Sequence, residues 1–173
     1  MNRFKRISLI FITLTLVFLF TSCDDNSTAE LNEDIEKYIH DYIVETLENE
    51  SRPYDACFVS NSILYVEESE DITSVYLMQL FSCYILDEKG EPIEDSGGSI
   101  PKKYDVKNDG ESYTIVNIEM PRDGNEYWES IDEIFPSKAV QIIKSFPDSQ
   151  RQKKLETEIQ KQIKAKYPDI SFE

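Results

Sequence analysis

Two long apolar stretches, residues 56–66 and 73–86, constrain the fold of this chain more than any other feature. Both are rich in valine, isoleucine, tyrosine and phenylalanine, which is the composition typical of β-strands. The segment between them, residues 67–71, is acidic and suits a turn exposed to water. The pattern therefore predicts a long β-hairpin with its turn centred near Glu70.

The position of the turn decides which residues face one another across the hairpin. With the turn near Glu70, paired residues have numbers that sum to about 140, so Cys57 faces Cys83. Directly opposite residues of an antiparallel pair have close Cβ atoms, but a slip of one residue would place them on opposite faces. Two interpretations stay open: a disulfide between Cys57 and Cys83, or two reduced cysteines packed as small apolar side chains.

Helical patterns flank this hairpin in the sequence. Residues 31–47 carry apolar side chains at intervals of three and four, which predicts an amphipathic helix. In the second half of the chain, Ser130 and Glu133 have the spacing of a capping box, so a short helix is expected there. Two further helices are predicted over residues 138–146 and 150–166.

The middle of the chain supplies the remaining strands. Residues 102–107 indicate a third strand and residues 113–120 a fourth, separated by turn-forming residues at 108–110. Gly90 and the run 96–99 are expected to form a loop. A helix, then three or four antiparallel strands, then further helices predict an α+β fold in which the helices pack on one face of the sheet.

The first 23 residues look like a bacterial lipoprotein signal. A basic start is followed by a nearly continuous apolar run, residues 7–20, and then by the small residues Thr21 and Ser22 before Cys23. In such signals the cysteine thiol takes a lipid and the chain is cut just before it, which anchors the protein to a membrane. An ordinary secretory signal and an uncleaved membrane anchor are the alternatives.

This signal divides the chain into three expected parts. Residues 1–22 are a signal peptide, residues 23–30 are the lipidated Cys23 and a polar tether, and residues 31–173 are one α+β domain. The expected location is the extracytoplasmic face of the cell membrane, which the protein reaches through its lipid anchor.

The charge of the chain limits its partners. Removing residues 1–22, which carry three basic and no acidic residues, takes the formal net charge from −16 to −19. Residues 24–137 hold 29 acidic and 7 basic residues, whereas residues 138–173 hold 5 acidic and 8 basic ones. So acidic a surface argues against nucleic acid and against anionic lipid head groups, and it would suit a cationic partner or divalent ions. Solubility alone is the alternative explanation.

The sequence carries no set of residues that indicates catalysis. His40 is the only histidine, so the usual zinc and Ser-His-Asp arrangements lack residues. Ser99 and Lys102 have the Ser-x-x-Lys spacing of penicillin-binding enzymes, but the chain has neither Lys-Thr-Gly nor Ser-Asp-Asn. We therefore expect no catalytic residue, no metal and no cofactor, and a binding or regulatory function. The alternatives are a small-ligand or cation-binding lipoprotein and, given 34 acidic residues, a carboxylate-based hydrolase.

Three short segments carry a resemblance to a known family: residues 96–101, the Lys-Asn-Asp-Gly turn at 107–110, and Pro-Arg-Asp-Gly at 121–124 leading to Ile-Phe-Pro at 134–136. They resemble a small extracytoplasmic domain of stand-alone lipoproteins, which is also appended to membrane metallopeptidases of the kind that sense β-lactams. Ile100 stands where the family pattern has glycine. The resemblance implies an extracytoplasmic location and a regulatory or sensing context with an envelope protein as partner, and it supplies no catalytic residues.

Turn residues in these segments are the candidates for contact with a partner. The glycine-rich run contributes Gly97 and Gly98, the 121–124 turn contributes Arg122 and Asp123, and Trp128 follows. Tryptophan and arginine are enriched among the residues that dominate binding energy at interfaces. The alternatives are a structural turn with a local Arg122–Asp123 ion pair, and core packing for Trp128. The basic C-terminal helix is a second candidate surface.

Overall fold

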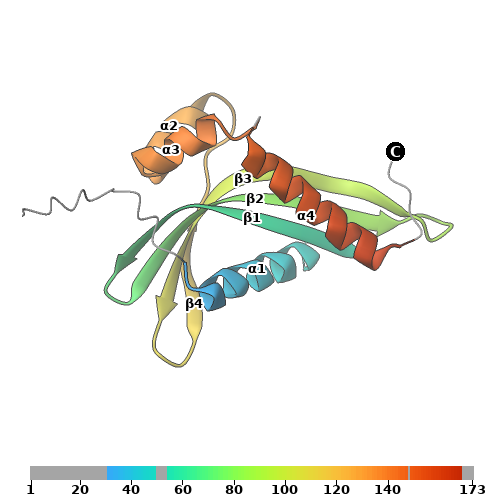
Figure 1. Ribbon diagram of the computed structural model, residues 1–173, viewed down its shortest axis with the longest axis horizontal. Coiled ribbons are helices and arrows are strands. Elements are labelled where there is room, and N and C mark those ends of the chain that lie inside the picture. Colours follow the sequence, from blue (N-terminus) through green and yellow to red (C-terminus); the bar gives the residue numbers. More distant parts are fainter. Residues whose placement is uncertain (1–30, 50–53, 148, 169–173) are drawn as a thin grey trace, which may run out of the picture.

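A four-stranded antiparallel sheet forms the centre of the protein in a computed structural model, which describes residues 31–49, 54–147 and 149–168. The strands pair in chain order: β1 (Ala56–Ser69), β2 (Ile72–Leu86), β3 (Pro92–Asn108) and β4 (Tyr113–Glu119). One helix precedes the sheet in sequence and the others follow it (Figure 1). This arrangement confirms the predicted α+β fold class. The predicted signal peptide, Cys23 and the tether lie outside the described residues.

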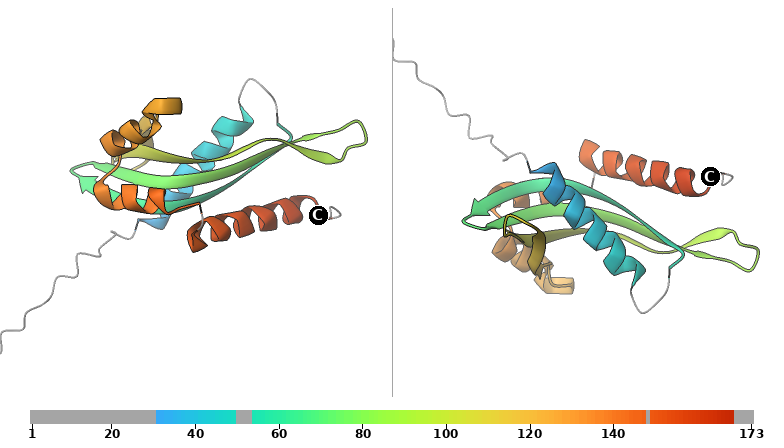
Figure 2. Two further views of the ribbon diagram at one scale, coloured as in Figure 1. Left: turned by 90° about the horizontal axis from the view of Figure 1, so that it is seen from above. Right: turned by 90° about the horizontal axis from the view of Figure 1, so that it is seen from below.

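Helices cover both faces of the sheet, so the expectation of a single covered face is wrong. α1 (Glu33–Glu48) packs on one face, while α2 (Tyr127–Ile134), α3 (Ser137–Lys144) and α4 (Gln150–Lys166) pack on the other. A short 3-10 helix, η1 (Gly124–Glu126), leads into α2. Figure 2 shows α1 and α4 on opposite sides of the sheet.

The central strands are apolar on both faces, which explains the two helical layers. Along β1, Ala56 and Phe58 pack in the cluster under α4, whereas Cys57 and Val59 pack in the cluster under α1. Every residue of 56–60 is buried, and the same is true of 75–79 in β2. A strand buried on both faces has a continuous apolar run rather than an alternating one, and the sequence shows such runs at these positions.

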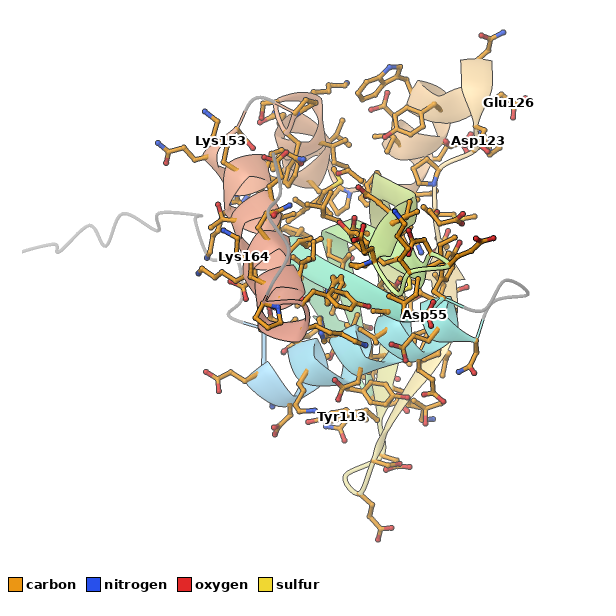
Figure 3. The ribbon with its side chains drawn as sticks, turned by 90° about the vertical axis from the view of Figure 1, so that its right-hand side faces the viewer. Asp55, Tyr113, Asp123, Glu126, Lys153 and Lys164 are labelled. Atoms are coloured by element: carbon orange, nitrogen blue, oxygen red, sulfur yellow. A yellow bond between two sulfur atoms is a disulfide. The ribbon has the colours of Figure 1, made fainter. Side chains whose placement is uncertain are left out.

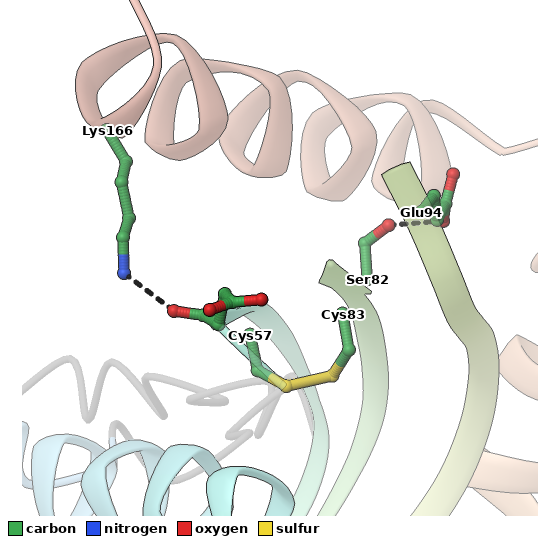
Figure 4. The surroundings of a disulfide bond; sticks show 6 residues. Cys57, Ser82, Cys83, Glu94 and Lys166 are labelled. Carbon is green, nitrogen blue, oxygen red and sulfur yellow. Dashed lines mark hydrogen bonds between the residues drawn. A yellow bond between two sulfur atoms is a disulfide. The ribbon is translucent and has the colours of Figure 1, made fainter. Parts of the chain in front are cut away.

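The first hairpin has the predicted register. Cys57 lies opposite Cys83, and their sulfur atoms are joined in a disulfide bond (Figure 4). Of the two interpretations of these cysteines, the structure therefore has the bonded one. Glu70 in the turn adopts the left-handed conformation, with φ of 51°.

β3 is the largest departure from the expected secondary structure. Residues 96–99, expected to form a loop, lie inside the strand, where Gly97 pairs with Ser82 and Gly98 with Phe81. A Cβ atom on Gly98 would lie 3.2 Å from the ring of Phe81. The glycine therefore allows an aromatic ring to approach the backbone closely, which is one of the reasons for glycine inside a strand.

Candidate interaction surface

β3 has an open edge along its first half. β4 pairs with β3 only from Lys103 to Asn108, although β3 begins at Pro92. Within the part of the chain that the structure describes, no strand runs beside residues 92–101 on the side away from β2. In Figure 1 this stretch extends from the middle of the sheet to the hairpin at the right. Open edges of this kind can accept another strand.

The main-chain groups of Gly97 and Ser99 point toward this open edge. Asn108 donates its N–H to the carbonyl oxygen of Asp71 on the β2 side, at 3.0 Å. Because main-chain groups alternate in direction along an antiparallel strand, odd-numbered residues from Lys107 back to Gly97 direct theirs away from β2. The odd-numbered residues nearest to Lys107 face β4, whereas Gly97 and Ser99 are exposed to solvent.

The opposite edge of the sheet is occupied by side chains of α4. Arg151 donates to the carbonyl oxygen of Ile63 at 3.0 Å, and Gln162 donates to that of Val59 at 2.9 Å. A hollow of about 520 Å³ lies along this edge between α1 and α4. Because helix side chains already bind these β1 carbonyls, the edge is poorly suited to accept another strand.

An acidic groove lies beside the open edge, between β3 and α4. α4 packs mainly against β1, which leaves room between the helix and β3. The groove has a volume of about 420 Å³. Its charged residues are the carboxylates of Glu94, Asp95 and Glu156, and no lysine or arginine occurs among the described residues that line it. A concave site with charges of one sign attracts ligands of the opposite sign.

A β-bulge aims Glu94 into this groove. The pairing of β2 with β3 shifts after Cys83, which makes Asp95 the extra residue. Ser82 donates its hydroxyl to the Glu94 carboxylate (Figure 4). A Cβ atom on Gly97 would lie 2.8 Å from Oε1 of Glu94. Gly97 therefore makes room for a positioned carboxylate instead of providing a flexible loop.

A smaller hollow of about 270 Å³ lies next to the groove and brings in Trp128. Ser99, Tyr127 and Trp128 are among its lining residues. Trp128 is 50% exposed, its ring packs edge-to-face on Tyr127, and the ammonium of Lys144 lies 5.7 Å from its centroid. Core packing, the alternative for Trp128, is therefore wrong. Because Ser99 directly follows Gly98, the structure brings Trp128 and the glycine pair to the same surface.

Arg122 and Asp123 lie apart from this surface, since neither lines the two hollows. Arg122 forms ion pairs of 3.0 Å with Glu126 and with Glu133, and these replace the Arg122–Asp123 pair considered from the sequence. Figure 3 shows Asp123 and Glu126 together at the outer end of this segment. Of the five sequence candidates, three therefore lie on one surface and two do not.

Ser130 fastens the start of α2 to the preceding turn. Its side chain is fully buried, accepts the backbone N–H of Arg122 at 2.9 Å and donates to the carbonyl oxygen of Tyr127 at 2.8 Å. The capping box expected at Ser130 is wrong because α2 begins at Tyr127, three residues earlier. The hydroxyl binds one turn of its own helix instead of capping the helix start.

Replacing this buried hydroxyl is expected to destabilise the domain. In Ser130→Ala the N–H of Arg122 loses its acceptor and a buried hydroxyl is removed, so we expect the free energy of unfolding to fall by about 1–2 kcal/mol. Urea unfolding followed by circular dichroism measures the change. Ser145→Ala, at an exposed serine that bonds only to carbonyls of its own helix, is the matched control and should have little effect. Equal stability of the two variants would contradict the assignment.

A charged cluster holds β4 against β3 at the point where the open edge ends. The Nζ atom of Lys103 lies 2.8 Å from Glu119 and 3.2 Å from Asp105. Burial lowers the pKa of Lys103, but its hydrogen bonds to these two carboxylates outweigh burial and raise it overall. For Asp105, burial raises the pKa, but hydrogen bonds from Ser74, Asn117 and Lys103 outweigh it and lower the pKa overall. The cluster is therefore charged at neutral pH.

Among the described residues, three carboxyl groups have clearly shifted pKa values. Asp71, Asp105 and Asp109 all have lowered pKa values, in Asp71 mainly through its hydrogen bond with Lys107. A general acid requires a raised pKa. The described residues contain no group of three or more side chains that could hold a metal ion.

Among the helices of the described residues, none combines the length and the apolar composition that a membrane span needs.

Glu94, Ser99 and the open edge are absent from the interaction candidates that the sequence provides. Glu94 has no distinctive neighbour in the sequence, because its partner Ser82 comes from another strand. The run 92–101 holds two prolines and a glycine pair, which are residues typical of loops. They made this part of β3, a strand longer than β4, hard to predict from the sequence.

Comparisons of the chain with protein-family models, with curated proteins and with solved structures find no match. The resemblance seen in the sequence therefore stays a prediction. The function of this domain has to be inferred from the geometry of the β3 edge and its groove.

Proposed function

We propose that this chain is a lipid-anchored extracytoplasmic lipoprotein whose α+β domain binds or regulates an envelope protein. The observation that carries the proposal is the open edge of β3 beside an acidic groove, because both are accessible from solvent. The disulfide between Cys57 and Cys83 supports an exported location, since such bonds persist in oxidising compartments. The anchor on Cys23 rests on the sequence pattern.

Binding rather than catalysis is the function that these features favour. The hydrolase alternative needs a carboxyl group with a raised pKa, and the clearly shifted carboxyl groups among the described residues, Asp71, Asp105 and Asp109, have lowered pKa values. The acidic groove also favours the second candidate, a lipoprotein that binds a small cationic ligand. A thermal-shift screen with metal ions and amines separates the two, because only the second predicts a raised melting temperature.

Crosslinking in living cells tests the proposal. Tagged wild type and Cys23→Ser are crosslinked, purified under denaturing conditions and analysed by mass spectrometry. We expect an envelope protein that is recovered with wild type and lost or reduced with Cys23→Ser, because the lipid holds the domain near its partner. The sequence resemblance favours a membrane sensor protease as that partner. Recovery of no envelope protein with either form would contradict the proposed function.

A further inference from the structure

We propose that the open edge of β3 at Gly97 and Ser99 accepts an extended, positively charged segment of another protein as a fifth strand of the sheet. This inference rests on the proposed binding function and names its mode and the chemistry of its partner. An extended peptide that joins a sheet edge gains affinity from main-chain hydrogen bonds and specificity from alternate side chains.

The main-chain geometry suits strand addition. Gly97 and Ser99 both direct an N–H and a C=O away from β2, and they are two residues apart, which is the repeat of a β-strand. The side chains on this stretch are a hydrogen and a hydroxymethyl group, so they leave space for an incoming backbone. Beyond them, Pro101 has no N–H to offer and β4 begins to pair at Lys103. The stretch of β3 that can accept a new strand is therefore short, and it ends before Pro101.

The charges around the edge select a cationic segment. Residues 87–95 hold five acidic residues and one basic residue, and Glu94 is held at the groove by Ser82. Lysine or arginine side chains on the groove side of the added strand would meet these carboxylates. Trp128 lines the hollow next to Ser99, but the ammonium of Lys144 already lies 5.7 Å from its ring centroid, so the carboxylates are the groups that select the cationic segment.

The same charges disfavour a second copy of this chain as the occupant. Pairing two β3 edges would bring two acidic stretches together, and like charges on facing strands are destabilising. The formal net charge of −16 for the chain acts in the same direction. Acidic residues at the edge thus disfavour pairing with a second copy and favour a basic partner.

Binding of a designed peptide tests the inference on the full chain in detergent micelles. The probe is a short fluorescent peptide of alternating lysine and threonine, and its anisotropy reports binding. One control peptide replaces lysine with glutamate, and another carries N-methyl groups on alternate residues, which block the hydrogen bonds of one strand edge. We expect the lysine peptide to bind, the glutamate peptide not to bind, and N-methylation to weaken binding about tenfold.

A pair of variants at one position separates the main-chain edge from its side chain. Ser99→Pro removes the outward N–H, at an edge position where proline is tolerated, and Ser99→Ala keeps it. We expect Ser99→Pro to weaken the lysine peptide about tenfold and Ser99→Ala to leave its affinity within about twofold. Hydrogen exchange should show slower exchange at Gly97 and Ser99 when the peptide is bound to wild type.

Several results would overturn the inference. They are a failure of the lysine peptide to bind, equal binding of the N-methylated peptide, and equal binding to Ser99→Pro and wild type. A concentration-dependent dimer that Ser99→Pro abolishes would assign the edge to a second copy instead. Crosslinking distinguishes this failure from failure of the proposed function, because an envelope partner recovered equally with wild type and Ser99→Pro would leave the binding function standing without the edge.

Discussion

Removing the disulfide between Cys57 and Cys83 is expected to lower the free energy of unfolding by about 3–4 kcal/mol. The bond joins residues 26 positions apart, so it restricts the unfolded chain over the whole β1–β2 hairpin. Both cysteines are also buried in the cluster under α1, where smaller side chains would leave space unfilled. The two effects act in the same direction.

The measurement is urea unfolding of wild type and of Cys57→Ala/Cys83→Ala, both carrying Cys23→Ser. In this background the pair is the only source of thiols, because the chain has three cysteines. Reductant should lower the unfolding midpoint of the parent to near that of the double variant and should leave the double variant unchanged. A parent midpoint that does not respond to reductant would contradict the disulfide in the native protein.

The hairpin was predictable from sequence because its local signals agree with its tertiary role. Its strands are apolar and β-branched, its turn is charged, and these choices place Cys57 opposite Cys83 without knowledge of the rest of the fold. The amphipathic stripe of α1 was equally clear, since Ile35, Ile39 and Ile43 recur every four residues. In both elements, local signals in the sequence are enough to indicate the structure that forms.

The remaining errors arise where a residue serves a tertiary contact. Gly98 indicates a loop by composition, but in the structure it lies against the Phe81 ring inside β3. Ser130 has the spacing of a capping box, but its buried hydroxyl accepts the backbone N–H of Arg122. The prediction that the helices cover a single face was also wrong, because a strand that is buried on both faces does not indicate which face a given helix takes.

The candidate surface could be predicted only in part for the same reason. Trp128 and the glycine pair were recognisable as unusual residues, but an open edge is a relation between two strands, β3 and β4, that differ in length. Glu94 acquires its role from a bulge and from Ser82 on a neighbouring strand. The unpaired part of β3 and the contact of Glu94 with Ser82 both depend on how the strands pair, so they cannot be read from the sequence alone.

Alkaline pH is expected to destabilise this domain in part through Tyr104. Burial holds the pKa of this phenol well above its ordinary value of 10.0, and the nearby Tyr42 raises it further. The native state therefore keeps Tyr104 neutral while the unfolded chain ionises it. Because ionisation favours the unfolded chain, the contribution of Tyr104 to the free energy of unfolding keeps its full value below pH 10 and falls as the pH rises above that value. The loss from this residue alone is about 1.4 kcal/mol for each pH unit over which only the unfolded chain ionises.

Tyr104→Phe isolates this contribution. At neutral pH we expect it to cost about 1 kcal/mol, because the hydroxyl of Tyr104 donates to Oε1 of buried Gln79 at 3.2 Å. Between pH 10 and pH 12 its stability should fall less steeply than that of wild type, by about the 1.4 kcal/mol per unit assigned to one phenol. Tyr113→Phe, at a partly exposed position on β4, is the control and should keep the wild-type slope. If Tyr104→Phe and wild type lose stability at the same rate, Tyr104 ionises in the native state, and the buried phenol is not what makes the domain sensitive to alkali.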